Sequence, residues 1–506
     1  MIAVEDAGHM ADSNRGTGSL IAVAVVIIIA IIALAVFRFD LGGLRSMISQ
    51  SFETPGGDPR LFNNTAPDPK TDETPGPGGL TRPDEAKYRR KWDTPLPERI
   101  RITRTIAGSP IELELRLVPQ GIFKMGENDQ VQANMPQREI WLDDCYVSTT
   151  EVTNSQYYAF ILDGGYSKPQ YWSQEGAEYA LDSLGLGGSY FIGWQRIEQS
   201  GRLRALASPE NKVTLEVRES GLVLGQSDVS VLVLPNRAAW KDYLRYDAEN
   251  GNVMLEFSGT WKNVLPEDLA RDQRVKDAGL YFTTNHAGQV DLSSALATDS
   301  YQVIAWAYGA KERPIFARIS LSTSSHMRAP AMPVVGLSWF EAEAFCNYLG
   351  GKLPTEAQWE KTARGTDARH YPWGVDIPWG AKFMGRDGIE RVGSAMSNIN
   401  RWDVMEVGAM TQDIGPYGHR DLCGNAAEWV RDVYLERPEW AEANPFSRGS
   451  DKSRRTIRGG STNDDDPQVC RGYYRRYSDP YTRGNHALGF RIVFTPEEAL
   501  KAAERK

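Results

Sequence analysis

The pattern of apolar positions changes its period several times along the chain, and each change predicts a different kind of element. Near the start, residues 19–37 (SLIAVAVVIIIAIIALAVF) are uncharged throughout, close to the ~20 residues that a helix needs to cross a bilayer. We therefore expect a transmembrane anchor after a short N-terminal tail at 1–18. A cleaved signal peptide is the alternative, because Ala33-Leu34-Ala35 resembles a cleavage site.

The next segment, residues 38–98, does not have the composition of a buried core. It is rich in Pro and Gly interleaved with Asp and Thr, as in ETPGGDPRLFNNTAPDPKTDETPGPGG. Such a composition is typical of an extended, solvated linker. We expect a tether that joins the anchor to a globular body beginning near residue 99.

The globular body opens with a strand pattern and continues into a helical one. In SPIELELRLVPQG, every second residue from Ile111 to Leu117 is apolar, which predicts a half-buried strand. In TTEVTNSQYYAFILDGG, the apolar residues Tyr157, Phe160 and Ile161 recur at helical spacing, which predicts an amphipathic helix.

Residues 170–330 have a different character from the chain on either side. Short segments rich in β-branched and aromatic residues predict strands: VTLEVRES, VSVLVLP, NVMLEFSG, GLYFTT, YQVIAWAY and IFARISLS. The dipeptide Asn250-Gly251 predicts a hairpin turn, and LPEDLARDQRVKDAG predicts a short helix. We expect an inserted β-sandwich-like domain that divides a main domain into two parts, 99–169 and 331–496.

After the insert, the helical period returns in PVVGLSWFEAEAFCNYLGGKLPTEAQWEKTARG. Ser338 with Glu341, and Thr355 with Gln358, have the spacing of capping boxes, so two short helices are expected, each ended by glycine. Beyond them, Gly, Pro, Trp and Asn interrupt the chain, which predicts irregular structure held by aromatic packing and buried hydrogen bonds. A short C-terminal tail at 497–506 is expected to follow.

Composition narrows the possible partners and sites. The 506 residues carry a formal net charge of −9, which argues against nucleic acid as a partner. The cysteines Cys145, Cys346, Cys423 and Cys470 lie far apart without a CxxC pair, so neither a zinc site nor a dense disulfide framework is expected. Cys346 lies among apolar residues of a predicted helix and is assigned to the core.

Seven motifs of the main domain occur in a characteristic order: GIFKMG, TEVTNSQYYAF, PVVGLSWFEAEAFCNYLGGKLPTEAQWEKTARG, YPWG, DLCGNAAEWVRD, RTIRGGS and LGFRIVF. This order resembles that of the sulfatase-modifying-factor family, which includes the formylglycine-generating enzymes, over residues 110–165 and 333–495. The resemblance implies an α+β, C-type-lectin-like fold with little regular structure. The family also includes an iron-dependent branch and structural envelope components, so the fold alone does not fix the activity.

The resemblance makes a specific demand on cysteine. Formylglycine-generating enzymes bind copper(I) with two nearby cysteines upstream of GFR, because soft Cu(I) favours thiolate ligands. Counted back from GFR, these positions fall on Gln468 and Tyr473, and Cys470 stands alone between them. We therefore expect no copper site and assign Cys470 to the core or to a half-buried strand. The alternative is a reactive thiol whose pKa is lowered by nearby arginines.

Calcium is the cofactor that the resemblance does imply. The family builds a calcium site on the turn that corresponds to DLCGNAAEWV, with Asp421 and Glu428 as side-chain ligands and Gly424 and Ala426 as carbonyl ligands. Oxygen ligands of this kind suit a hard cation, although a plain turn with solvated carboxylates is the alternative. The family's second calcium site would fall on SNINRWD, at Asn398 and Ile399.

Two arginines in the family motifs are expected to have structural roles. Arg458 in RGGS and Arg491 in LGFR are assigned to ion pairs with buried carboxylates such as Glu151 or Glu356. The six histidines are scattered without the spacing of metal ligands, so no iron site of the family's iron-dependent kind is expected.

Together these features predict a single-pass, membrane-anchored and non-catalytic protein that acts as an interaction or scaffold module with protein partners in the cell envelope. The alternative is an oxidoreductase of the formylglycine-generating type, or another enzyme on the same fold. The tether and the calcium-type turn favour an extracytoplasmic body, whereas Arg38 and Arg45 after the anchor weakly favour a cytoplasmic one.

Overall fold

The computed structural model describes residues 82–504, apart from gaps at 107–108, 129–135, 183–191, 197–202, 211–212, 218–227, 236–238, 248–251, 279, 293–300, 307–314, 320–325, 386–387, 439 and 484. The predicted anchor at 19–37 and most of the tether at 38–98 lie outside the described residues. In the part of the chain that is described, no helix has both the length and the apolar character needed to cross a membrane.

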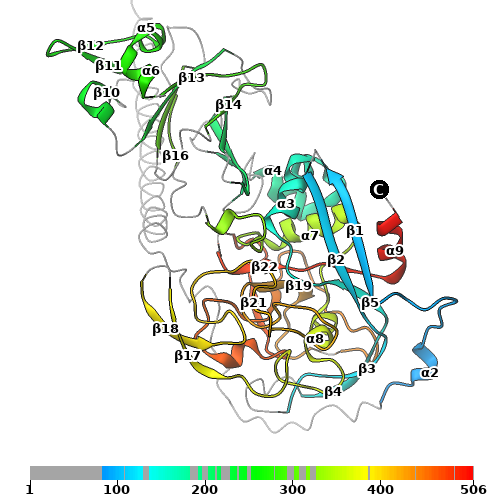
Figure 1. The fold of residues 1–506 in the computed structure, drawn as a ribbon. Helices are drawn as coiled ribbons and strands as arrows, with labels where there is room; N and C mark the ends of the chain where they lie inside the picture. Colours follow the sequence, from blue (N-terminus) through cyan, green and yellow to red (C-terminus); the bar gives the residue numbers. More distant parts are fainter. Residues whose placement is uncertain are drawn as a thin grey trace, which may run out of the picture. The chain divides into compact units, whose positions relative to one another are not determined.

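An antiparallel sheet with helices packed against it forms one side of the main domain (Figure 1). Its strands, in spatial order, are β1 (Arg99–Ile106), β2 (Ser109–Val118), β5 (Cys145–Ser148) and β23 (Val493–Phe494). The alternation predicted for β2 is confirmed, because Ile111, Leu113 and Leu115 are buried and Leu117 is half-buried. Helix α3 contacts β2, and α9 contacts β1.

Three helices form where the sequence predicts helical periodicity, and each begins with a capping box. These helices are α3 (Asn154–Leu162), α7 (Trp339–Leu349) and α8 (Glu356–Arg364). The boxes predicted at Ser338 and Thr355 are confirmed, and Thr153 provides a third. Gly350 ends α7 in the left-handed conformation, with φ of 84°, which glycine adopts without steric cost.

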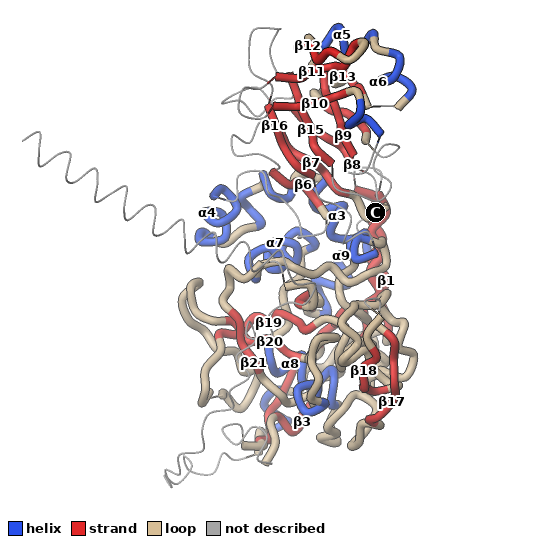
Figure 2. The backbone as a smooth tube through the Cα atoms, turned by 90° about the vertical axis from the view of Figure 1, so that its left-hand side faces the viewer, coloured by secondary structure: helices blue, strands red, loops and turns tan. Residues whose placement is uncertain are grey.

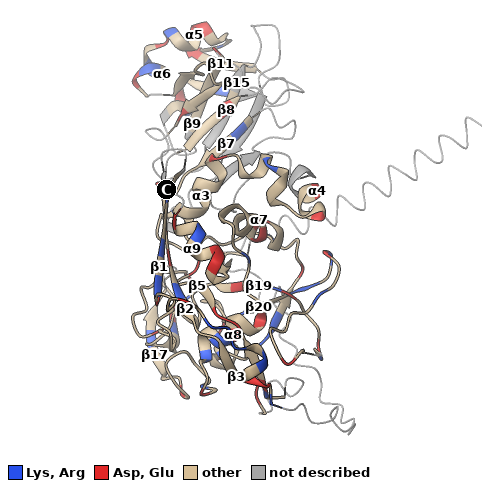
Figure 3. Cartoon of the chain, turned by 90° about the vertical axis from the view of Figure 1, so that its right-hand side faces the viewer, with Lys and Arg blue, Asp and Glu red and all other residues tan. Residues whose placement is uncertain are grey.

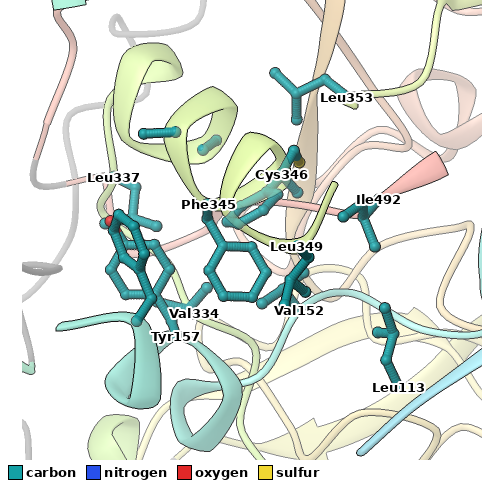
Figure 4. Packing of buried hydrophobic residues seen from close by; sticks show 14 of the residues in the cluster. Leu113, Val152, Tyr157, Val334, Leu337, Phe345, Cys346, Leu349, Leu353 and Ile492 are labelled. Carbon is teal, nitrogen blue, oxygen red and sulfur yellow. The ribbon is translucent and has the colours of Figure 1, made fainter. Parts of the chain in front are cut away.

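The apolar faces of α3 and α7 meet in an aromatic cluster (Figure 4). Tyr157 of α3 stacks on Phe345 of α7 with ring centroids 5.4 Å apart, and Phe490 lies 5.6 Å from Phe345. Cys346 is fully buried in the same cluster, as expected. Since burying one such side chain contributes roughly 1.5–3 kcal/mol, this cluster is a main source of stability for the domain.

The rest of the main domain consists of small sheets joined by long loops (Figure 2). The strands are β3 (Gly121–Met125), β4 (Arg138–Leu142), β17 (Trp379–Met384), β18 (Glu390–Ser394), β19 (Ala427–Val433), β20 (Arg455–Arg458), β21 (Arg476–Ser478) and β22 (Leu488–Phe490). The pairs β3–β4 and β17–β18 are hairpin-like, and the third sheet has the order β21-β20-β19-β22, with β22 parallel to β19. The irregular structure predicted for this region is confirmed.

The inserted region contains two four-stranded sheets that share an apolar interior. One has the order β14 (Gln289–Asp291), β8 (Val213–Val217), β7 (Leu203–Ala207) and β6 (Gly193–Arg196), and the other β13 (Tyr281–Thr283), β9 (Ser230–Pro235), β15 (Tyr301–Trp306) and β16 (Ile315–Ile319). Val231 and Val233 of β9 face the interior between the sheets, whereas Leu232 and Leu234 face a second cluster. This alternation is that of a sandwich strand covered on both faces.

The second cluster lies under a small sheet and two short helices. These elements are β10 (Leu244–Asp247), β11 (Asn252–Phe257), β12 (Thr260–Asn263), α5 (Pro266–Arg271) and α6 (Gln273–Asp277). The single helix predicted in LPEDLARDQRVKDAG is therefore two, because Asp272 caps a new helix start with its side chain. The predicted hairpin turn at Asn250-Gly251 lies outside the described residues, but the strands on either side of it pair antiparallel.

Three segments expected to be linker, insert or tail instead pack on the main domain. Residues 82–98 include α2 (Glu85–Tyr88), and Trp92 donates a hydrogen bond to Asp144. Trp172, just before helix α4 (Gln174–Asp182), and Tyr179 within it both pack on the main core. The strand-rich region therefore begins after this helix. The predicted tail is helix α9 (Pro496–Glu504), whose Ala499 is buried in that core. Short 3-10 turns complete the described chain: Gly165–Ser167, Pro169–Tyr171, Ala239–Asp242, His326–Arg328 and Pro467–Cys470.

Removal of residues 183–325, with Asp182 joined to His326 by a Gly/Ser linker, should leave a main domain that folds. We expect a lower melting temperature than for the whole chain, because Ile192 and Leu206 pack on the main core. Unfolding should stay cooperative, since the interior of the insert forms separate clusters. Circular dichroism melts measure this, and a truncated protein without a cooperative transition would contradict the modular interpretation.

Candidate functional site

Cys470 lies in the short 3-10 turn Pro467–Cys470. The expectation that it lies in a strand was therefore wrong. Asp466 caps this turn, since its side chain accepts a hydrogen bond from the backbone N–H of Gln468 at 2.9 Å. The Cys470 side chain is fully buried in an apolar cluster with Tyr371 and Val469. Its expected place in the core is confirmed.

The sequence suggested that Cys470 stands alone, but the structure places a second cysteine in its cluster. Cys423 is also fully buried and packs in the same apolar cluster. Burial, followed by the neighbouring thiol, raises the pKa of Cys423 well above its usual value. Cys423 is therefore protonated near neutral pH, which disfavours nucleophilic chemistry at its sulfur.

The two positions that correspond to the family's copper ligands have a different chemistry here. Gln468 is half-buried at the surface of the turn. Tyr473 is fully buried, accepts a hydrogen bond on its phenol oxygen from Arg471 at 2.6 Å, and lies 5.0 Å below the guanidinium of Arg364. A phenol held between two guanidinium groups takes the place of a thiol, so these positions do not supply a soft ligand pair.

The other cysteines and a buried histidine offer no reactive group either. Cys145 and Cys346 are buried, and burial raises the pKa of Cys145 to about 12. His419 is fully buried beside the carbonyl of Val147, and burial, with the nearby guanidinium of Arg491, lowers its pKa to about 3. His419 is therefore neutral and does not act as a general acid near pH 7.

Arginines of the family motifs form buried ion pairs, although not all with the expected partners. Arg458 donates to Glu360 at 2.6 Å, and Glu356, the partner expected from the sequence, lies farther away at 3.9 Å. Glu356 is instead held by Arg475, at 2.7 Å, and Arg364 completes the network with a 2.6 Å bond to Glu360. The network connects α8 to β20 and to the loop before β21. Figure 3 shows how basic and acidic residues are distributed over the helices and strands of the main domain.

Glu428, expected to be a calcium ligand, forms a buried pair with Arg491. Its carboxylate accepts from Arg491 at 2.5 and 2.6 Å and from the indole N–H of Trp359 at 2.7 Å. Arg491 also donates to the carbonyls of Ser148 and Asp421. Both carboxylate oxygens of Glu428 are thus engaged by protein groups. Glu151, the other carboxylate expected to pair with Arg491, accepts from the Asn425 amide instead.

Asp421, Glu151 and Asp413 are three buried carboxyl groups of this region. Burial, with the charge of Asp421 next in importance, raises the pKa of Glu151 well above its usual value, and burial likewise raises that of Asp413. One buried oxygen each of Glu151 and Asp413 has no hydrogen-bond donor. These acidic groups are therefore buried and incompletely hydrogen-bonded.

The loops that carry the two expected calcium sites meet where Asn398 pairs with Gly424. The backbone N–H of Asn425 donates to the carbonyl of Asn398 at 2.8 Å, and the side chains of the two asparagines bond to each other at 2.9 Å. Gly424, with φ of 87°, packs so closely that a Cβ would lie 2.5 Å from that carbonyl. Ala426 donates to Glu151, and Ile399 is buried in the cysteine cluster. Among the described residues, no group of three or more His, Cys, Asp and Glu side chains is placed to hold a metal ion.

Several site residues were not found from the sequence. Glu360 and Arg364 are four apart on α8, a spacing that predicts an ion pair and was available as a signal. Asp413 and Cys423 had no such local signal, because long-range contacts alone bring them to Asp421 and Cys470.

The Glu428–Arg491 pair supplies a direct test of the network. Glu428→Gln should lower the free energy of unfolding by about 3–5 kcal/mol, because it leaves Arg491 buried without a counter-charge. Glu428→Gln combined with Arg491→Met should recover part of this loss in chemical denaturation. The control Glu390→Gln breaks an exposed pair with Lys382 and should cost no more than about 1 kcal/mol. Equal effects of the two single substitutions would contradict the assigned importance of the buried pair.

Comparison with known proteins confirms the resemblance carried by the motifs. The model of the sulfatase-modifying factor enzyme 1-like domain matches residues 112–496. Inactive C-alpha-formylglycine-generating enzyme 2 of Mus musculus is 32% identical over 149 residues, which cover 26% of this chain and 45% of the relative. The formylglycine-generating enzyme of Streptomyces coelicolor is 33% identical over 144 residues, covering 26% of this chain and 42% of the relative.

A third relative has a different activity in its name. Hercynine oxygenase of Mycobacterium tuberculosis is 29% identical over 161 residues, which cover 30% of this chain and 34% of the relative. The chain spans less than half the length of these three relatives. Because the family model matches most of the chain, from the second strand to the start of the last helix, this protein belongs to the sulfatase-modifying factor enzyme 1-like domain family.

Proposed function

We propose that this protein is a non-catalytic member of its family, anchored in a membrane through residues 19–37, whose extracytoplasmic body binds protein partners in the cell envelope. The burial of the cysteines is the main support for the absence of catalysis. All four cysteines of the chain lie in the part that the structure describes, and all are buried. A thiol in this state does not reach the cysteine of a substrate peptide.

Copper-dependent cysteine oxidation requires two accessible soft ligands, and the corresponding positions of this chain do not provide them. Cysteine oxidation on this fold needs thiolates that bind Cu(I) and also meet the substrate thiol. Here the corresponding residues are Gln468 and Tyr473, and the Tyr473 phenol is fixed by Arg471. The name of the mouse relative, an inactive enzyme, supports this proposal, whereas the name of the Streptomyces relative is that of an active one.

An interaction role is supported by the surface around the β17–β18 hairpin. Five large apolar side chains within residues 375–392 are at least 38% exposed: Val375, Trp379, Met384, Ile389 and Val392. Exposed apolar side chains clustered in one stretch of chain are typical of a protein-binding surface. Buried hydrogen bonds, such as that between Asn398 and Asn425, fix the loops next to this surface.

Calcium is proposed as a structural ion, with ligands revised from those expected. Asp421 and Glu151 would provide the carboxylates, and Gly424 and Ala426 the carbonyls, while Glu428 stays paired with Arg491. The support is the electrostatic cost of two buried carboxyl groups, Asp421 and Glu151, one oxygen of which has no hydrogen-bond donor. A bound cation would offset that cost and fix the turn before Trp429.

Incubation of the purified full-length protein with a cysteine-containing sulfatase peptide, copper(I), oxygen and a thiol reductant should give no aldehyde. The reason is that no thiol of the folded protein meets the peptide. Hydrazide labelling and mass spectrometry of the peptide provide the measurement, with the Streptomyces coelicolor relative as positive control. Aldehyde formed at a rate above the protein-free background would overturn the non-catalytic proposal.

The calcium proposal predicts opposite effects of one substitution in two buffers. In EDTA at pH 7.5, Glu151→Gln should melt at a higher temperature than the unmodified protein, because it removes one of two facing carboxylates. In calcium, the unmodified protein should gain about 2.7 kcal/mol at a hundredfold excess over Kd, and Glu151→Gln should gain much less. The exposed control Glu390→Gln should respond to calcium like the unmodified protein. A melting temperature that calcium leaves unchanged would remove the ion from the proposal.

A copper-dependent oxidoreductase is the second candidate, because Cys423 provides a second thiol in the cluster of Cys470. Two neighbouring thiols fit the donor set of Cu(I), although their burial excludes a substrate. Anaerobic Cu(I) titration against a competing chelator should show no tight site in the reduced protein. A tight site that disappears in both Cys423→Ser and Cys470→Ser would favour the enzyme over the interaction module.

A further inference from the structure

Cys423 and Cys470 are far apart in sequence but meet in the core, and the function proposed above makes no use of them. Both side chains are fully buried and pack in the same apolar cluster. The other two cysteines belong to separate clusters: Cys145 packs with Val118 and Val147, and Cys346 with the α7 core. Of the four cysteines, all of which the structure describes, only Cys423 and Cys470 share a cluster.

The backbone on both sides fixes the two sulfur atoms in this arrangement. The N–H of Cys423 donates to Asp413 at 3.0 Å, and the N–H of Gly424 donates to the carbonyl of Gly459 at 2.9 Å. Gly460 has φ of 68°, and a Cβ at this position would collide with the Cys470 sulfur. The space for that sulfur thus exists because residue 460 is glycine, and the hydrogen bond from Gly424 brings the Cys423 segment beside it.

We propose that Cys423 and Cys470 form a disulfide bond when the chain folds in the presence of a disulfide-form oxidant such as oxidised glutathione. One thiolate first attacks the oxidant, forms a mixed disulfide and releases one molecule of reduced thiol. The second thiolate then attacks the protein sulfur of that mixed disulfide and releases the other. Two protein thiols are oxidised by two electrons, and one small disulfide is reduced to two thiols.

Burial decides when the bond forms. In the folded protein both sulfur atoms are inaccessible to a small disulfide, so exchange takes place before the cluster closes or during opening. Once formed, the bond joins the turn before β19 to the loop before β21. Both segments are irregular, and a cross-link that closes a long loop limits the unfolded state most. The bond would therefore stabilise the least regular part of the main domain.

Peptide mapping tests the proposal on the full-length protein. The denatured, reduced chain is refolded with a mixture of oxidised and reduced glutathione, alkylated in denaturant without reduction and digested with trypsin. Cleavage after arginine should release peptides 421–431 and 459–471 as one linked species, which separates into two on reduction. Cys145 and Cys346 should carry the alkyl group. The oxidised protein should also melt several degrees higher than protein refolded in dithiothreitol.

Variants and competing outcomes make the result decisive. Cys346→Ala should keep the linked peptides, whereas Cys423→Ser and Cys470→Ser should abolish both the link and the difference in melting temperature. Alkylation of all four cysteines after oxidative refolding to the native circular dichroism spectrum would overturn the proposal. A link through Cys145 or Cys346, or a copper ion retained by the reduced pair in oxidative buffer, would overturn it as well.

Discussion

Buried arginines paired with buried carboxylates hold together the half of the main domain that has little regular structure. Arg491 with Glu428, and Arg458 and Arg364 with Glu360, connect helix α8, strands β19 and β20, and the chain after β22. Each buried charge has a partner of opposite sign. Removal of one partner would lower the free energy of unfolding by about 3–5 kcal/mol, because the other charge would stay buried and unpaired. The planar guanidinium is suited to this role, since it also reaches several backbone carbonyls, as Arg491 does with those of Ser148 and Asp421.

The same network is compatible with the proposal that this chain keeps the family fold without its copper chemistry. The Tyr473 phenol, in a position where catalytic relatives are expected to have a thiolate, is bonded by Arg471 and lies under Arg364. Stability therefore depends on charge pairing and aromatic packing, and neither requires an open metal site. Five of the exposed large apolar side chains lie on or beside the β17–β18 hairpin, and this grouping supports the proposed recognition of a protein partner.

Local patterns predicted from the sequence were confirmed where short-range physics decides the structure. The capping boxes at Ser338 and Thr355, the alternation in β2 and the strands of the insert all follow from residues close in sequence. Long-range packing supplies contacts that the sequence did not indicate. Glu428, expected to bind calcium, is paired with Arg491, and Cys470, expected to stand alone, shares its cluster with Cys423. Neither contact has a signal in sequence spacing. The segment 497–506, expected to be a tail, forms most of α9, because its two buried alanines meet the core only in the folded chain.

Because all four cysteines are buried, we expect no thiol of the folded protein to be available to a substrate. Titration of the reduced, full-length protein with an aromatic disulfide reagent, first under native conditions and then in denaturant, measures this availability most directly. We expect that none of the four cysteines reacts before unfolding and that all four react afterwards. Rapid reaction of Cys470 in the native protein, lost on Cys470→Ser, would contradict the non-catalytic proposal.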